Sequence, residues 1–335
     1  MRARPDVDRA AVSGPDPAPS PDRRIWLNGQ LVAWEQATVH VLSHSLQRGS
    51  LIFDYMSVHE TPRGAAIFRL KDHVERFQRS AELTGLPLAL AGPAIEAAVV
   101  ETTRANPGAR AVKLSAFLAA VEVDVVPMDD RVSVAVAAYD PLADVIERNP
   151  GHFPMPSTVR LWVEKQRRNR REDIMPPQAK VAANYASPMA AKWAAQRAGY
   201  DEVVLLDEEG FVAEAPTSNV FWVDGEGALH TPPERRVLLG VTRRSILEIA
   251  RHDGLAVSEA RVRPEGLMQA AEVFLTGTNA SVWPVASIDE QPIGAGAPGP
   301  VSAKLSARFD EITSGRAADF PHWLTFVDEP RPGGS

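Results

Sequence analysis

The chain has 335 residues, of which 44% are apolar and 24% are charged, and its formal net charge is −7. This balance is typical of a globular protein with room for two domains, and the negative charge argues against nucleic-acid binding. Cysteine is absent, which excludes a disulfide scaffold and a cysteine metal site. The N-terminus lacks the apolar stretch of a signal peptide, and no apolar run reaches membrane-spanning length. The sequence therefore predicts a cytoplasmic protein that binds neither nucleic acid nor membrane.

The first part of the chain predicts a small α+β domain over residues 25–140. It follows an extension at 1–24 that is rich in Pro, Asp and Arg and is expected to be disordered. Asn28-Gly29 stands between two apolar runs, which is typical of a tight hairpin turn. The elements expected here, in chain order, are a hairpin at 25–34, strands at 52–61 and 65–70, helices at 70–85 and 94–105, and strands at 110–121 and 131–140.

The second part predicts a larger domain over residues 158–327. A linker at 141–157, with four prolines and one glycine, separates it from the first, and the tail at 328–335 is expected to be flexible. Ser187 and Pro188 predict the cap and the first turn of a helix. The elements expected here are strands at 158–165, 202–207, 211–214, 219–223 and 272–279, and helices at 188–199 and 240–254.

Lys180 lies in a segment of small, mostly apolar residues, which is typical of a buried segment. Lys180 is followed by V-A-A-N-Y, and these small residues would desolvate an amine, as an imine-forming lysine requires. Tyr185 lies five residues further on, within reach of the same site. A surface charge is the ordinary interpretation of any single lysine, so this stretch alone leaves both interpretations open.

Further features could supply a buried acid and several anion-binding sites. Glu214 ends a short apolar strand, either as a turn cap or as a buried acid that keeps a heteroaromatic nitrogen protonated. Gly-Val-Thr at 240–242 opens a helix and Thr-Gly-Thr at 276–278 ends a strand, and both are either ordinary caps or anion-binding turns. Arg76 is either a surface arginine or a phosphate partner.

Together, a poised lysine, an acid, a tyrosine and several anion sites are the set that pyridoxal phosphate requires. No His, Asp and Glu cluster has metal-ligand spacing, so no metal site is predicted.

Residues 25–325 resemble the fold-type IV pyridoxal-phosphate enzymes, the class IV aminotransferases and their relatives. The matching segments, in order, are VHVLSHSLQRGSLIFD, FRLKDHVERF, AKVAANY, GYDEVVLLDEEGFVAEAPTSNVFWV, LLGVTRRSIL and EVFLTGTNASVWPV. The resemblance implies an α/β protein of fold type IV. Its first domain would be α+β, its second a mixed, barrel-like α/β domain, and the cofactor would lie in the cleft between them.

The resemblance also implies roles for individual residues. Lys180 would form the Schiff base with pyridoxal 5'-phosphate and shuttle the proton between substrate and cofactor. Glu214 would face the pyridine nitrogen, and Tyr185 would bind the phenolic oxygen. The residues expected to hold the phosphate are Arg76, Val241, Thr242 and Thr278.

The substrate side departs from the branched-chain aminotransferases that the chain resembles. Those enzymes usually carry Tyr-Ile-Arg-Pro, whose tyrosine and arginine help to bind the substrate carboxylate, where this chain has Ala111 and Lys113. Lys113 either replaces that arginine as the carboxylate contact, or points to solvent on an edge strand, or stays in an ion pair. Tyr55 occupies a position where those enzymes usually have glycine. Arg48 occupies a position where they usually have tyrosine. The substrate-binding residues are therefore expected among Lys113, Tyr55, Phe53, Arg48, Thr278 and Asn279.

The function that this resemblance favours is transamination between an aliphatic, branched-chain-like L-amino acid and a 2-oxo acid such as 2-oxoglutarate. A homodimer or a larger assembly is implied, because a second subunit completes the pocket in this family. Two alternatives share the fold: a D-amino-acid or (R)-amine transaminase, and a pyridoxal-phosphate lyase like aminodeoxychorismate lyase. A further alternative is a binding relative without catalysis, and the retained Lys180, Glu214 and Tyr185 argue against it.

Overall fold

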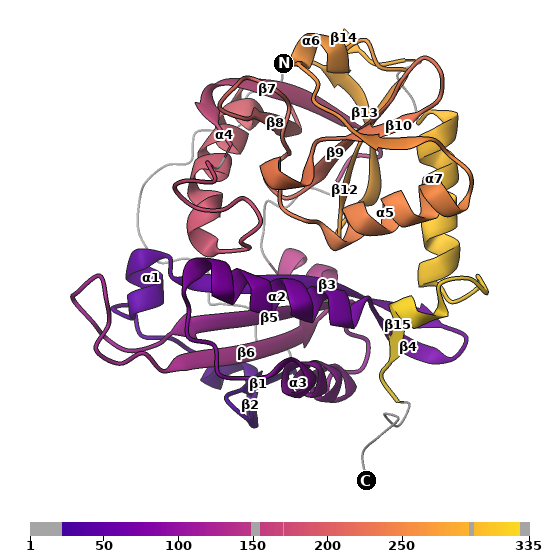
Figure 1. Cartoon of the computed structure of the whole chain (residues 1–335). Coiled ribbons are helices and arrows are strands. Elements are labelled where there is room, and N and C mark those ends of the chain that lie inside the picture. The colour runs from indigo at the N-terminus through magenta and orange to yellow at the C-terminus, as the bar shows by residue number, and fades with distance from the viewer. Residues whose placement is uncertain (1–21, 149–154, 170, 295–297, 329–335) are drawn as a thin grey trace.

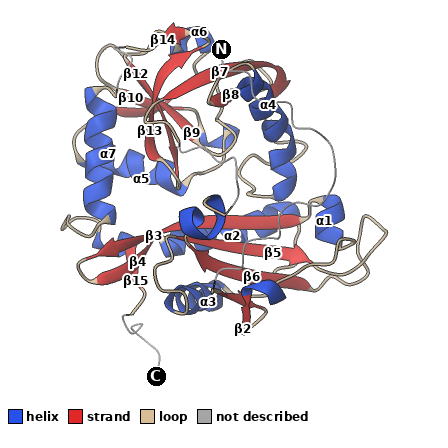
Figure 2. Cartoon of the chain, turned by 180° about the vertical axis from the view of Figure 1, so that it is seen from behind, coloured by secondary structure: helices blue, strands red, loops and turns tan. Residues whose placement is uncertain are grey.

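Two β-sheets, one in each half of the molecule, organise the chain (Figure 1). The computed structural model describes residues 22–148, 155–169, 171–294 and 298–328. The same two halves are seen from behind in Figure 2, where helices lie beside each sheet.

The first sheet has seven strands, all paired antiparallel, in the order β15-β4-β3-β5-β6-β1-β2. Helices α2 and α3 pack on one face of it, against the alternate apolar residues of β3, β5 and β6. The elements of this half are β1 (Arg24–Leu27), β2 (Gln30–Ala33), η1 (Trp34–Gln36), α1 (His44–Arg48), β3 (Leu51–Thr61), β4 (Gly64–Phe68), α2 (Leu70–Thr84), α3 (Gly92–Arg104), β5 (Ala111–Leu118), β6 (Val132–Tyr139) and η2 (Pro141–Ile146).

The second sheet has eight strands, seven of them in the order β11-β10-β9-β12-β13-β7-β8, with β14 added beside β13. It is mixed, because β7 runs parallel to both β8 and β13 while β9, β12 and β13 pair antiparallel. Its elements are β7 (Val159–Arg168), η3 (Ala182–Tyr185), α4 (Ala186–Arg197), β8 (Glu202–Leu206), β9 (Asn219–Val223), β10 (Leu229–Thr231), η4 (Glu234–Arg236), α5 (Val241–His252), β11 (Val257–Glu259), α6 (Pro264–Leu267), β12 (Glu272–Gly277), β13 (Ser281–Ile288), β14 (Gln291–Pro292) and α7 (Pro300–Thr313).

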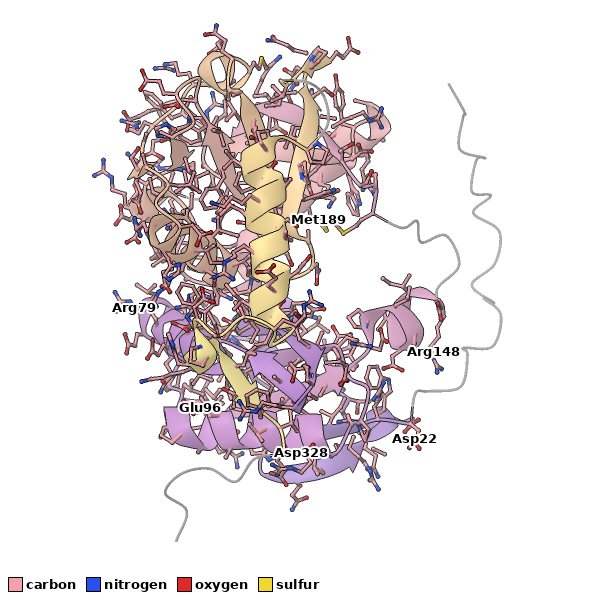
Figure 3. All side chains as sticks on the ribbon, turned by 90° about the vertical axis from the view of Figure 1, so that its right-hand side faces the viewer. Asp22, Arg79, Glu96, Arg148, Met189 and Asp328 are labelled. Atoms are coloured by element: carbon pink, nitrogen blue, oxygen red, sulfur yellow. The ribbon has the colours of Figure 1, made fainter. Side chains whose placement is uncertain are left out.

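The C-terminal segment joins the two halves. Helix α7 runs along the side of the molecule, and after η5 (Pro321–Trp323) the chain ends its described part in β15 (Leu324–Phe326), which pairs with β4 of the first sheet (Figure 3). The ring of Phe68 on β4 lies 5.1 Å from that of Phe309 on α7 and 5.8 Å from that of Trp323. This aromatic cluster continues the core of the second half into the first sheet.

Most of the predicted elements are confirmed. The hairpin turns at Asn28 and Gly29, whose φ angles of 50° and 95° are those that a tight turn between twisted strands needs. Gly85 ends α2 with a left-handed φ of 68°. Residues 1–21, 149–154 and 329–335 lie outside the described residues; they include most of the expected extension and tail and about a third of the expected linker. The described part of the linker contains η2, so its first residues are helical. Arg24, assigned to the extension, is the first residue of β1.

Two local predictions are wrong. Residues 211–214 are not a regular strand; they pair only through single bridges, Leu206 with Val212 and Glu214 with Asn219, because the chain changes partners within these few residues. Helix α4 begins at Ala186, so Ser187 lies inside the helix and does not cap it. The preceding 3-10 turn runs directly into α4, which moves the start ahead of the serine and proline.

Candidate active site

The backbone of Lys180 is held by the first half of the molecule. Its carbonyl accepts from the backbone N–H of Phe53 at 3.0 Å, and its own N–H donates to Ser80 Oγ at 3.0 Å. Val181 forms a bridge with Ile52 on β3. The lysine segment is thus fastened between β3 and α2, although it comes about a hundred residues later in the chain.

The side chain of Lys180 meets two aromatic rings. Its Nζ lies 3.0 Å from the Tyr185 hydroxyl, because the η3 turn brings Tyr185 back over the lysine. The same Nζ lies 4.8 Å from the centre of the Phe53 ring, and the Phe53 and Tyr185 rings are 5.2 Å apart. Lys180 is half-buried. The structure therefore brings together the predicted lysine and tyrosine, and both contact the ring of Phe53, which the sequence analysis expects on the substrate side.

Glu214 lies in the second half, and its side chain is buried. One carboxylate oxygen accepts from the backbone N–H of Leu238 at 3.0 Å and from Asn219 Nδ2 at 3.4 Å, and the other accepts from Asn169 Nδ2 at 3.4 Å. These donors come from three separate segments, which is the setting of a buried, oriented acid. Sequence reasoning missed both asparagines, and no spacing signal connects Asn169 with Glu214.

The N-terminus of α5 lies beside this acid. Asn219 Nδ2 also donates to Leu238 O at 2.9 Å, and a Cβ on Gly240 would come within 2.1 Å of Asn219 Oδ1, so a larger residue here would displace the Asn219 side chain. Val241 and Thr242 are both buried. Because the first N–H groups of a helix have no partner within the helix, this turn presents them, together with the Thr242 hydroxyl, as donors for an anion.

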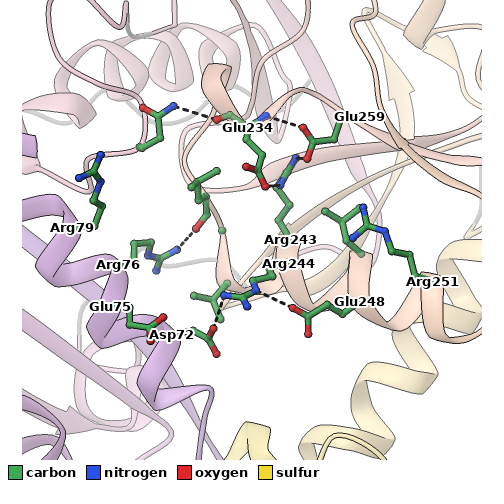
Figure 4. Close-up of a pocket in the computed structure, with 15 residues that line it drawn as sticks. Asp72, Glu75, Arg76, Arg79, Glu234, Arg243, Arg244, Glu248, Arg251 and Glu259 are labelled. Atoms are coloured by element: carbon green, nitrogen blue, oxygen red, sulfur yellow. Dashed lines mark hydrogen bonds and ion pairs between the residues drawn. The ribbon is translucent and has the colours of Figure 1, made fainter. Parts of the chain in front are cut away.

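Arg76 reaches the same turn from the other half. It donates to both carboxylate oxygens of Asp54, at 2.9 and 2.7 Å. It also donates to Leu239 O at 3.1 Å (Figure 4). His73 Nδ1 also lies 2.7 Å from Asp54. Burial alone would raise the pKa of Asp54, but the Arg76 and His73 charges hold it well below its usual range. Sequence reasoning missed Asp54, whose partners lie about twenty residues later on α2.

The open face of the first sheet carries Lys113. Strand β5 lies between β3 and β6, so Lys113 does not lie on an edge strand, although it is exposed to solvent. Lys113 Nζ lies 5.0 Å from the centre of the Phe53 ring that Lys180 also contacts. Burial, and then the charge of Lys180, lower the pKa of Lys113. Lys113 lines an apolar cavity of about 730 Å³ that extends over β5 and β6.

The other predicted substrate residues are spread around this face. Tyr55 stands directly opposite Lys113 on β3, and its carbonyl accepts from Thr278 Oγ1 at 3.3 Å. Asn279 is exposed in the turn between β12 and β13. Arg48 ends α1, and it donates to Val123 O at 3.0 Å in the loop after β5. Arg48 therefore fastens that loop.

Comparison with known proteins agrees with this arrangement. The protein-family model described as "Amino-transferase class IV" matches residues 51–288. The chain belongs to the class IV aminotransferases. It is 32% identical to the branched-chain-amino-acid aminotransferase of Pseudomonas aeruginosa, over 91% of this chain and 98% of that one. The corresponding Escherichia coli K12 enzyme is 30% identical, over 91% and 97% of the two chains.

Solved structures of class IV aminotransferases share the fold over nearly the whole chain. The branched-chain aminotransferase of Thermoproteus uzoniensis with norvaline superposes with a TM-score of 0.83 and 32% identity, over 91% of this chain and 99% of that one. A branched-chain amino acid aminotransferase from T.th., complexed with N-(5'-phosphopyridoxyl)-L-glutamate, superposes with a TM-score of 0.84 and 36% sequence identity. The superposition covers 92% of this chain and 100% of that one. The predicted family, fold type, enzyme class and pyridoxal-phosphate cofactor are confirmed.

None of the helices in the described ranges has both the length and the apolar content that crossing a membrane requires. The cytoplasmic location remains a prediction from the sequence.

Proposed function

We propose that this aminotransferase moves the amino group between an aliphatic, branched-chain-like L-amino acid and a 2-oxo acid such as 2-oxoglutarate. The observation that carries the proposal is the likeness to branched-chain aminotransferases over more than nine-tenths of the chain and nearly all of theirs. The contact between Lys180 and Tyr185 supports a working catalytic centre.

The donor set suits the cofactor. The α5 N-terminus with Thr242, together with Arg76, would hold the phosphate, because charge-assisted donors converge there from both halves of the molecule. Thr278 would add a hydroxyl, and Val241 its backbone N–H. Pyridoxal phosphate, when bound, supplies the carbonyl that takes up the amino group and the ring that withdraws electrons.

Three residues of the chain would then do the acid–base work. Lys180 Nζ would take the proton from the substrate Cα and return it, because a half-buried amine beside a phenol is held at one position. Tyr185 would orient that Nζ and contact the cofactor's phenolic oxygen. Glu214 would keep a proton on the pyridine nitrogen, since its own carboxylate is buried and held by donors from three segments.

Lys113 would bind the substrate carboxylate. Its ammonium shares the Phe53 ring with Lys180, which places a second positive charge beside the reacting amine. Lysine is a point charge and lacks the planar fork of arginine, so it constrains the orientation of a carboxylate less.

A homodimer is the assembly that the surface supports. The apolar cavity over β5 and β6 is open, and the loop after β5 carries large apolar side chains that are each more than half exposed, namely Val121, Val123, Val125, Val126 and Met128. Exposed apolar patches of this kind mark interaction sites. Light scattering should show a dimer, and replacing Val123 and Val126 with Asp should shift it to a monomer. A wild-type chain that is monomeric at micromolar concentration would contradict the dimer.

The donor is tested with the holoenzyme and one donor at a time, without a 2-oxo acid. Single L- and D-amino acids and (R)-1-phenylethylamine are added, and the visible absorbance of the bound cofactor is followed. We expect L-leucine, L-isoleucine and L-valine to remove it. A response only to D-amino acids or to the amine would favour the corresponding transaminase, and pyruvate released from aminodeoxychorismate would favour the lyase.

A further inference from the structure

Three neighbouring strands place two tyrosines on either side of a small residue. On the open face of the first sheet, Ala111 of β5 stands opposite Tyr139 of β6 and Ser57 of β3. Lys113 stands opposite Tyr55 on β3 and Ala137 on β6. Tyr55 and Tyr139 are therefore diagonal neighbours across β5, and the methyl group of Ala111 leaves room for their rings to approach above it.

The two tyrosines lie on the same face of the sheet, diagonally across β5. Burial, and then the neighbouring Tyr139, raise the pKa of Tyr55. The Tyr139 ring also packs edge-on against Trp34 at 6.4 Å, and Tyr139 lines the same cavity as Lys113. The backbone of Tyr55 is held by Thr278.

A phenol hydroxyl carries one proton, which it can donate to another group. A carboxylate is satisfied best by several donors at once, and a hydrogen bond from a neutral hydroxyl to a charged group is stronger than one between neutral groups. The ammonium of Lys113 and one phenol proton on the same sheet face make up such a set.

We propose that Tyr139, which lines the same cavity as Lys113 and lies diagonally across Ala111 from Tyr55, supplies a hydroxyl that acts with Lys113 to hold the substrate carboxylate. This hydroxyl would replace the tyrosine that branched-chain aminotransferases usually carry at the position of Ala111. Tyr139 is thereby a specificity-determining residue, because it favours donors with a carboxylate over simple amines. The inference rests on the proposed transaminase function.

The test measures binding and turnover separately. Wild type, Tyr139→Phe, Tyr55→Phe and the control Tyr200→Phe are loaded with cofactor, and the dissociation constant of 4-methylvaleric acid, a carboxylate without an amino group, is measured by calorimetry. Tyr200 lies on the α4 side of the second sheet, away from this face. We expect Tyr139→Phe to weaken binding about ten- to a hundredfold and to lower kcat/KM for L-leucine by a similar factor. The control should match wild type.

Several outcomes would overturn the inference: unchanged affinity in Tyr139→Phe, an equal loss in the Tyr200→Phe control, or a wild type that does not bind the acid. If wild type binds the acid but transaminates no aliphatic L-amino acid, the proposed function fails while the affinities still decide the role of Tyr139.

A rescue variant checks the replacement directly. Ala111→Tyr and Tyr55→Gly, added to Tyr139→Phe, return the hydroxyl to the position that is usual in the related enzymes. We expect this variant to recover most of the lost affinity. If it melts like wild type and does not recover affinity, the hydroxyl is not the missing donor.

Discussion

The proposed cofactor side and the proposed substrate side of this site are built from different kinds of contact. On the cofactor side, Glu214 and Thr242 are buried and Arg76 is nearly so, and Glu214 and Arg76 are tied to several segments, including the two residues before Gly240. On the substrate side, Lys113 stands on an open sheet face, and the loop beside it exposes its apolar side chains.

In the proposed dimer, this difference would separate the part of the site that one chain completes from the part that a second chain helps to form. Groups that handle the cofactor need fixed positions, because proton transfer and phosphate binding depend on geometry. The proposed substrate side is the open face of the first sheet. The positions that depart from the usual branched-chain pattern lie on this face, namely Tyr55, Ala111 and Lys113. The cofactor chemistry should therefore be sensitive to single substitutions, and the substrate side more tolerant of them.

The largest effect is expected at Lys180. Lys180→Ala removes both the amine that exchanges with the substrate and the group that moves the proton, so turnover should fall by several orders of magnitude to near background. The variant should still retain the cofactor through its phosphate contacts, as measured by phosphate content after dialysis. Appreciable turnover would refute the role of this lysine.

Glu214→Gln should have the next largest effect on rate. The amide keeps the shape of the side chain but removes the charge that supports a protonated pyridine nitrogen, so single-turnover conversion should slow by about a hundred- to a thousandfold. Glu226→Gln, in an exposed turn, is the matched control. Equal single-turnover rates in the two variants would show that Glu214 has only a structural role.

Asp54→Ala tests the support beneath Arg76. It leaves Arg76 and His73 without their carboxylate, which for a buried pair costs about 3–5 kcal/mol of unfolding free energy. Urea denaturation of the cofactor-free protein measures this loss. A loss no larger than that of an exposed carboxylate would contradict the assignment.

The same pair predicts a pH dependence. The pKa of Asp54 is lowered in the folded chain, so its contribution to stability is complete above the unfolded value of about 3.9 and is lost as the pH falls through the folded value. The stability difference between wild type and Asp54→Ala should stay constant from neutral pH to about pH 5 and shrink in stronger acid. A difference that grows on acidification would be contrary to this sign.

Thr242→Ala should weaken cofactor retention by one charge-assisted hydrogen bond, on the order of 1.5–3 kcal/mol. The dissociation constant of pyridoxal phosphate, followed by its absorbance, reports the change. Thr325→Ala on β15 serves as the control, and equal cofactor loss in both variants would place the phosphate elsewhere.

Lys113→Ala should give the smallest and most selective effect. We expect kcat/KM for amino-acid donors to fall roughly ten- to a hundredfold, and conversion of an amine without a carboxylate to stay nearly unchanged. Lys71→Ala, on the exposed side of α2, is the control. Equal loss on both kinds of donor would remove Lys113 from carboxylate binding.

The sequence by itself predicted most of the local elements, the pyridoxal-phosphate cofactor and the residues proposed to handle it. Turn residues such as Asn28-Gly29 and Gly85 act through their own φ angles, and the lysine segment, Glu214 and the helix start at Thr242 are short motifs whose chemistry is carried by adjacent residues. These signals are local, so they can be detected without knowing which strands pair.

Only the tertiary structure decided which residues support these groups. Asp54 holds Arg76 from a different element, and Asn169 and Asn219 hold Glu214 from two separate segments. Strand register places Tyr139 diagonally from Tyr55 across a third strand. The tertiary structure also shows that α4 begins at Ala186, before the predicted cap, and that β15 pairs with β4. Such contacts depend on strand order and register, which arise from packing between segments far apart in the chain, and no spacing within one segment records them.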